Sequence, residues 1–122
     1  MYKRQTLETL WLDSNKIGVA GAQPLADMLQ VNRALKTANL DDNEIGDGGT
    51  AALSEALKSN NTLETLKLYT NRIGLAGAQS LADMLQVNRA LASLDLRANN
   101  IARAQQRIVR KAWQGSKSGL QL

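Results

Sequence analysis

The stretch Leu7-Glu8-Thr9-Leu10-Trp11-Leu12-Asp13-Ser14-Asn15-Lys16-Ile17 determines how the rest of the chain is organised. It has the form L-x-x-L-x-L-x-x-N-x-I, and the same form begins again at residues 35, 63 and 91, always 28 residues after the previous start. The one departure within these copies is Ala38, which stands where the others have leucine. A period of this length predicts a solenoid in which equivalent residues stack on one another.

Each repeat is predicted to contain a short strand followed by a helix. In the first strand Leu10 and Leu12 point inward, whereas Thr9, Trp11 and Asp13 point outward, because strand side chains alternate between faces. The helix then packs on the other side of the sheet through leucines spaced four residues apart.

Polar residues suggest where these helices begin and end. Asp47 is expected to be the N-cap of a helix that runs to about Ser59. Asn32, Asn60 and Asn88 fall at the ends of successive helices, where a left-handed C-cap is expected.

The full repeat, LxxLxLxxNxIGxxGAxxLAxxLxxN, resembles leucine-rich repeats of the ribonuclease-inhibitor-like subfamily, which also supplies the repeat domains of NLR-type sensors. The resemblance covers essentially the whole chain. It implies an α/β leucine-rich repeat solenoid, a horseshoe arc with a parallel β-sheet on the concave face and helices on the convex face. The family's usual role implies protein binding by the concave face. The ribonuclease inhibitor often has cysteine at the positions of Asn15, Asn43, Asn71 and Asn99, so the resemblance favours an NLR-like or general scaffold over an inhibitor.

The length of 122 residues suits a single repeat domain spanning residues 1–122. Residues 102–122 are expected to form a C-terminal cap, in which Val109 and Trp113 take the places of core leucines and Leu120 begins a last strand. Residues 1–6 match only the tail of a repeat, so an N-terminal cap is expected to be absent. We therefore expect either a fragment of a longer array or a first strand covered by a partner.

The composition argues against catalysis. The chain has no cysteine and no histidine, which removes disulfides, thiolate metal sites and the commonest general base. The carboxylates of Asp41 and Asp42 are adjacent, but an open surface gives no means of separating their pKa values. We expect no enzyme activity, no metal, no cofactor and no membrane span, and a cytoplasmic location.

The concave face is where a protein partner, of unknown identity, is expected to bind. Trp11 and Tyr69 would serve as anchors, as aromatic side chains do in binding hot spots. Lys67 and Asp95 are predicted to pair across neighbouring strands. The asparagines at positions 15, 43, 71 and 99 are interpreted as a structural ladder that satisfies turn backbone groups. The full predicted site comprises Trp11, Asp13, Asn39, Asp41, Asp42, Lys67, Tyr69, Asp95 and Arg97.

A comparison within the chain supports this choice. Repeats 7–34 and 63–90 differ at only six positions: Trp11/Lys67, Asp13/Tyr69, Ser14/Thr70, Lys16/Arg72, Val19/Leu75 and Pro24/Ser80. Three of the six lie on the predicted concave face, whereas exposed helix positions such as Gln23, Asp27, Gln30 and Arg33 recur unchanged as Gln79, Asp83, Gln86 and Arg89. This bias suggests diversification of the concave side.

Two alternatives remain open. The net charge of +4 is uneven, because residues 97–122 contain six Lys/Arg and no Asp/Glu. A basic helical face could therefore bind nucleic acid or another anionic surface, with affinity that falls steeply with salt; its members are Arg103, Arg107, Arg110 and Lys111. Alternatively, the open N-terminal strand could drive self-association.

Overall fold

The computed structural model describes residues 8–122, which form a two-layered repeat structure. Five strands make one parallel sheet in the order of the sequence. They are β1 (Thr9–Trp11), β2 (Thr37–Asn39), β3 (Thr65–Lys67), β4 (Ser93–Asp95) and β5 (Leu120–Gln121). The predictions for residues 1–6 and the first repeat position, Leu7, lie outside the described residues.

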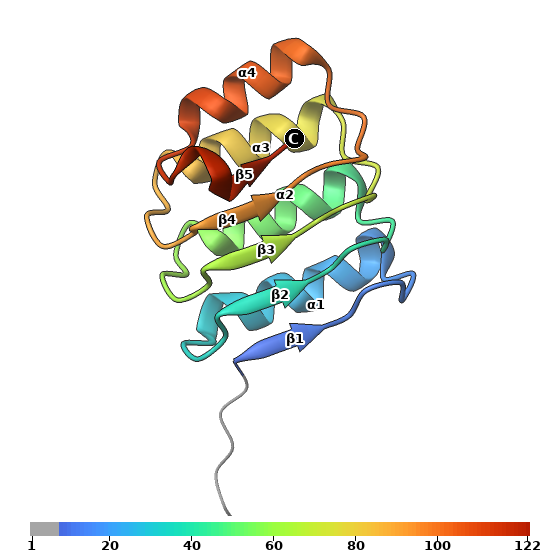
Figure 1. Cartoon of the computed structure of the whole chain (residues 1–122). Helices are drawn as coiled ribbons and strands as arrows, with labels where there is room; N and C mark the ends of the chain where they lie inside the picture. Colours follow the sequence, from blue (N-terminus) through green and yellow to red (C-terminus); the bar gives the residue numbers. More distant parts are fainter. Residues whose placement is uncertain (1–7) are drawn as a thin grey trace, which may run out of the picture.

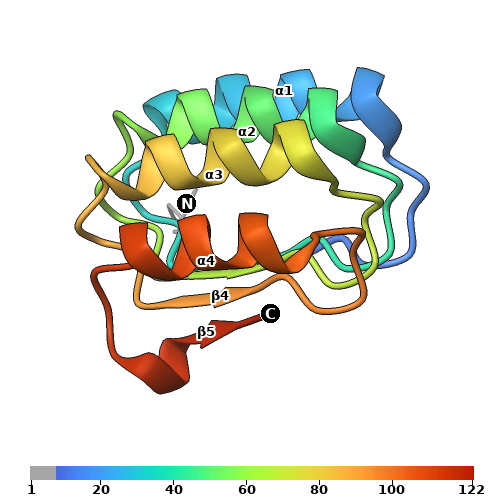
Figure 2. The same cartoon turned by 90° about the horizontal axis from the view of Figure 1, so that it is seen from above.

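Each of the first four strands is followed by a helix. These are α1 (Gly18–Val31), α2 (Gly46–Leu57), α3 (Leu75–Leu85) and α4 (Arg103–Ala112), and a 3-10 turn, η1 (Lys117–Gly119), precedes β5. Figure 1 shows the strands stacked in order from β1 to β5, and Figure 2 shows the helices along one side of the sheet. The predicted leucine-rich repeat solenoid is therefore confirmed, with one face of the sheet left open.

The core lies between the two layers and follows the 28-residue period. In the third repeat Leu66, Leu68 and Ile73 are completely buried. Burial of such a side chain contributes about 1.5–3 kcal/mol. The first repeat is less covered, since Leu10 and Leu12 are only partly buried against the core. The repeats at the middle of the array are therefore the best packed.

The asparagines of the L-x-x-N pattern join successive turns. Asn71 is fully buried, and its side-chain oxygen accepts hydrogen bonds from the N–H groups of Asn43 at 3.0 Å and Ile45 at 3.2 Å. Its side-chain nitrogen donates to the carbonyl of Leu40 at 2.8 Å. The amides of Asn43, Asn71 and Asn99 thus satisfy backbone groups of the repeat before them, which strand pairing leaves open.

The turns around these asparagines require left-handed backbone. Thr70 has φ = 56° and Arg72 has φ = 61°, on either side of Asn71. The same conformation recurs at Ser14, Lys16, Asp42, Glu44 and Ala98. This conformation is energetically unfavourable for residues other than glycine, and at Thr70 and Arg72 the hydrogen bonds of the buried Asn71 side chain hold the turn in place.

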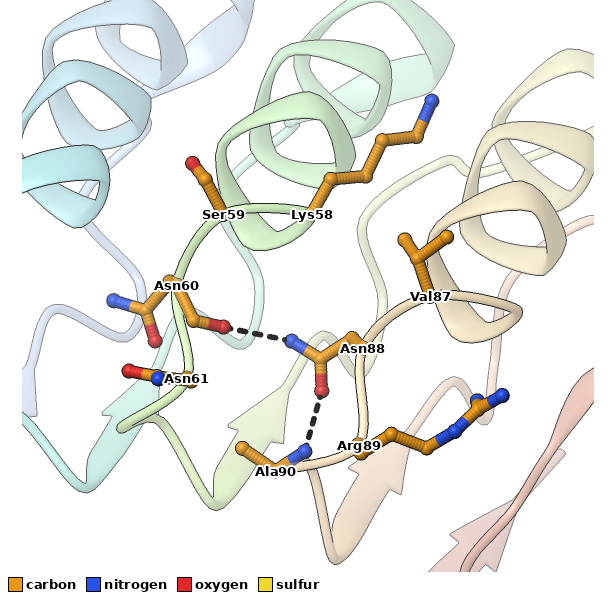
Figure 3. Close-up of a pocket in the computed structure, with 8 residues that line it drawn as sticks. All are labelled: Lys58, Ser59, Asn60, Asn61, Val87, Asn88, Arg89 and Ala90. Atoms are coloured by element: carbon orange, nitrogen blue, oxygen red, sulfur yellow. Dashed lines mark hydrogen bonds between the residues drawn. The ribbon is translucent and has the colours of Figure 1, made fainter.

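A second amide ladder lies at the other end of the helices. The Asn88 side chain donates to the carbonyl of Leu57 at 2.8 Å. It also donates to the carbonyl of Asn60 at 3.0 Å, and its oxygen accepts from the Ala90 N–H at 3.0 Å (Figure 3). Asn60 makes the equivalent contacts with Leu29 and Asn32. The prediction of left-handed C-caps at these asparagines was wrong, since Asn32 is extended (φ −75°, ψ 130°) and none of the three has positive φ.

The predicted N-cap role of Asp47 was also wrong. Helix α2 begins at Gly46, and Asp47 lies inside its first turn without capping it. Its carboxylate instead accepts hydrogen bonds from the N–H groups of Gly74 at 2.6 Å and Gly77 at 3.0 Å. It therefore stabilises the start of α3, where unpaired N–H groups and the helix dipole favour an anion.

Candidate protein-binding surface

The open face of the sheet aligns one outward residue from each of four strands. Parallel pairing places Trp11 opposite Asn39, Asn39 opposite Lys67, and Lys67 opposite Asp95. Neighbouring strands lie about 4.8 Å apart, so these residues form one continuous row. We call this row, with the residues that follow it in each turn, the open sheet face.

Two aromatic side chains are exposed on this face. Trp11 is 62% exposed and Tyr69 is 43% exposed. The guanidinium of Arg97 lies over the Tyr69 ring, 5.8 Å from its centroid, which is within the range of a cation–π contact. Tyr69 is thus positioned by a neighbour, while Trp11 offers a larger free apolar surface.

Asp95 does not make the predicted ion pair with Lys67. Its carboxylate binds Arg97 through two hydrogen bonds, from Nε at 3.0 Å and from Nη2 at 2.9 Å. Burial opposes ionisation of Asp95, but the hydrogen bonds and charge of Arg97, with the charge of Lys67, outweigh it and lower the pKa. Asp95 is only 6% exposed, so it positions Arg97 more than it meets solvent.

Asp41 and Asn39 are also engaged within the protein. The Asp41 carboxylate accepts a hydrogen bond from the Tyr69 N–H at 2.8 Å, and the Asn39 side chain accepts one from the Asp41 N–H at 3.0 Å. Burial raises the pKa of Asp41, the bond from Tyr69 partly offsets this, and the charge of Asp95 raises it further. Asn39 is 7% exposed, so its direct contribution to a binding surface is small.

Of the remaining predicted residues, Asp13 and Asp42 lie in the turns that follow β1 and β2, and Lys67 lies in the central row. Asp13 and Asp42 are exposed, and Lys67 is half-buried. Asp42 accepts a hydrogen bond from the Ser14 hydroxyl at 3.2 Å. The structure therefore brings all nine predicted residues to one face but divides them into exposed groups and internally bonded groups.

Within residues 8–122 there is no cluster of three or more Asp, Glu, His or Cys side chains suited to a metal ion. The same residues contain no helix with the length and apolar character needed to cross a membrane.

One group of residues was not assembled by sequence reasoning. Arg110, Trp113, Lys117 and Leu120 line a depression at the C-terminal end of the array, between the end of α4 and β5. The sequence pattern predicts Arg110 on a basic helical face and Trp113 at a core position, and it does not predict that either residue lies near Lys117. The sequence feature that could have indicated this depression is the absence of acidic residues from 97 to 122.

Comparison with known families identifies the class. The "Leucine Rich repeat" family matches residues 3–26, 31–54 and 59–82, more than half of the chain. The chain therefore belongs to the leucine-rich repeat family. No curated protein matches it in sequence.

Two solved structures share the fold. Actin-binding site 2 of leiomodin-1 is similar with a TM-score of 0.73 and 21% identity, over 84% of this chain and 62% of that chain. The C-terminal domain of tropomodulin from Caenorhabditis elegans is similar with a TM-score of 0.63 and 14% identity, over 87% of this chain and 81% of that one. This chain thus spans less than two thirds of the leiomodin chain. At these identities the similarity concerns the fold, and the ribonuclease-inhibitor-like assignment stays a prediction.

Proposed function

We propose that this protein is a non-enzymatic, cytoplasmic scaffold that binds a protein partner through its open sheet face. The observation that carries the proposal is the exposure of Trp11 and Tyr69 on the side of the parallel sheet that the helices leave open (Figure 2). Exposed aromatic side chains with few rotatable bonds are the commonest binding anchors, and the surrounding charges set orientation and association rate.

The exposed members of the predicted site carry most of this proposal. Trp11, Tyr69 and Arg97 would contact the partner directly, with Asp13 and Asp42 at the rim. Asp41, Asn39 and Asp95 would act by holding their neighbours in place, because their polar atoms are already bonded within the protein.

Actin is a reasonable first partner to test, because the leiomodin-1 segment with this fold is described as an actin-binding site. Binding can be measured by fluorescence anisotropy with labelled monomeric actin. If actin does not bind, a photo-crosslinking residue at position 11 or 69, followed by mass spectrometry, identifies partners from a cell extract.

The matched controls lie on the helical side. Val31 is 77% exposed and Val87 is 57% exposed, so Val31→Ala and Val87→Ala remove exposed apolar surface away from the sheet. We expect Trp11→Ala with Tyr69→Ala to abolish partner binding and the two valine variants to preserve it. Equal crosslinking from positions 11 and 31 would contradict the proposal.

A further inference from the structure

The C-terminal end of the array carries a depression with the features of a binding site. Its volume is about 430 Å³, within the range of about 300–1,000 Å³ of pockets that take small ligands or single anchoring side chains. Its lining is mostly apolar, with Trp113 and Leu120 as the apolar residues and Arg110 and Lys117 as the cations. We call it the end pocket.

Local packing fixes the tryptophan in this pocket. The Trp113 indole N–H donates to the Ser116 carbonyl at 2.8 Å. A Cβ at Gly115 would come within 2.7 Å of the indole, and one at Gly119 within 3.1 Å, so the loop closes against the ring. The apolar part of the pocket is therefore preformed, which reduces the entropy lost when a ligand binds.

The charges of the pocket select the sign of the ligand. Arg110 and Lys117 are both exposed, and they come from two different elements, α4 and η1. The four-residue lining contains no acid, and neither does the sequence from 97 to 122. Such a surface attracts anions and orients them before contact.

The geometry points to a peptide-binding site that takes an acidic segment with one large apolar side chain. The apolar side chain lies against Trp113 and Leu120, and flanking carboxylates bind Arg110 and Lys117. β5 is the edge strand of the sheet at this end, and an extended peptide can add to such an edge through main-chain hydrogen bonds. This site is separate from the open sheet face.

A peptide fits these observations better than nucleic acid. Base stacking needs a free aromatic face, whereas Trp113 is half-buried and its indole lies against Gly115 and Gly119. The arginines nearer the start of α4, Arg103 and Arg107, do not line the pocket. They supply a control with the same charge on the same helix.

The test uses the whole chain and a fluorescein-labelled peptide of sequence Glu-Asp-Glu-Leu-Asp-Glu, followed by anisotropy. We expect saturable binding that weakens when serine replaces the peptide's leucine. The double variant Arg110→Gln, Lys117→Gln should bind about tenfold more weakly, since two charged contacts are lost. The control Arg103→Gln, Arg107→Gln has the same net charge and should change affinity by less than about twofold.

Other results would overturn the inference. If both double variants lost the same affinity for the peptide, the peptide would be attracted by the general positive charge of this end and not by the end pocket. Equal binding of the leucine and serine peptides would lead to the same conclusion. Tighter binding of a short oligothymidylate, or of vesicles of phosphatidylserine and phosphatidylcholine, would assign the surface to those ligands. Absence of peptide binding would also reject it. Trp11→Ala should leave peptide binding intact, so failure of the open sheet face and failure of the end pocket can be distinguished.

Discussion

The carboxylate of Asp47 accepts a hydrogen bond from the Gly74 N–H at 2.6 Å, which connects α2 of one repeat to the start of α3 in the next. The equivalent residues of the first and third repeats, Val19 and Leu75, have no such group, so the contact is particular to the second repeat. Gly77 allows this approach, because a Cβ there would lie 2.7 Å from the same oxygen.

We expect Asp47→Ala to lower the free energy of unfolding by about 1.5–3 kcal/mol, because it removes a charged acceptor from two helix N–H groups. Urea denaturation followed by circular dichroism measures this. Asp83→Ala is the control: it removes the same charge from the exposed surface of α3, where the Asp83 carboxylate accepts a hydrogen bond from the Gln79 side chain. Its expected cost is below about 0.5 kcal/mol. Similar losses in both variants would show that the contact with α3 contributes little.

The amide ladder predicts a gradient of mutational cost along the array. Asn71→Ala should cost about 2–5 kcal/mol, since it leaves the buried N–H groups of Asn43 and Ile45 unpaired and removes one of the two hydrogen bonds to the Leu40 carbonyl. Asn15→Ala should cost less than about 1 kcal/mol, because Asn15 is exposed and its side chain donates to the Asp13 carbonyl. Both values come from urea denaturation, and equal costs would contradict a stabilising role for the ladder.

Ser54 offers a stabilising substitution. Its hydroxyl is buried and has no hydrogen-bond partner among the described residues, and the equivalent positions hold Ala26 and Ala82. Ser54→Ala should raise the free energy of unfolding by up to about 1 kcal/mol, because an unsatisfied polar group is removed.

A neighbouring hydroxyl gives the control for Ser54. Thr50 is also buried, but its hydroxyl donates to the Gly46 carbonyl at 2.7 Å. Thr50→Ala should therefore destabilise the protein by about 0.5–1.5 kcal/mol. Thermal melts of the two variants should shift in opposite directions, and a loss of stability in Ser54→Ala would count against this account.

The open sheet face should affect how stability depends on pH. The pKa of Asp95 is lowered from its ordinary value of 3.8 in the folded protein. Its ionised form therefore adds to the free energy of unfolding in full above pH 3.8, and this addition is lost as the pH falls through the folded pKa. The pKa of Asp41 is raised, so this residue has the opposite effect. Ionised Asp41 lowers the free energy of unfolding by its full amount above the folded pKa, and this loss disappears below pH 3.8.

Arg97→Gln tests this balance. Without the guanidinium, burial dominates at Asp95 and raises its pKa, so the stability lost by the variant should be larger at pH 7 than at pH 3. The measurement is the urea midpoint across that range. Arg72→Gln is the control, since its ion pair with Glu44 is exposed and long at 3.8 Å. A difference between wild type and Arg97→Gln that does not vary with pH would contradict the role of this pair.

The repeat spacing was sufficient to predict the solenoid, because leucines at one period must stack to be buried. It also placed Trp11, Lys67 and Asp95 correctly in one row, since strand alternation fixes which side chains leave the core. These predictions depend on the register alone.

What the sequence did not provide was the choice of polar partner. Asp47 matches a local capping pattern, yet the N–H groups that donate to its carboxylate lie 27 and 30 residues further along the chain. Asp95 has two cations near it, Lys67 on the neighbouring strand and Arg97 two residues later in the chain. It binds Arg97 through two side-chain hydrogen bonds. A linear pattern does not distinguish such partners, because their relative positions depend on how adjacent repeats are packed.

The direction of the amide ladder has a consequence for synthesis on the ribosome. The turn of the first repeat is completed by Asn43, which accepts from the Asn15 N–H and donates to the Leu12 carbonyl. A nascent chain therefore exposes each turn before the side chain that will complete it has been translated. Until the following unit emerges, the newest segment is incomplete, and this is the interval in which a chaperone or a premature contact would act on it.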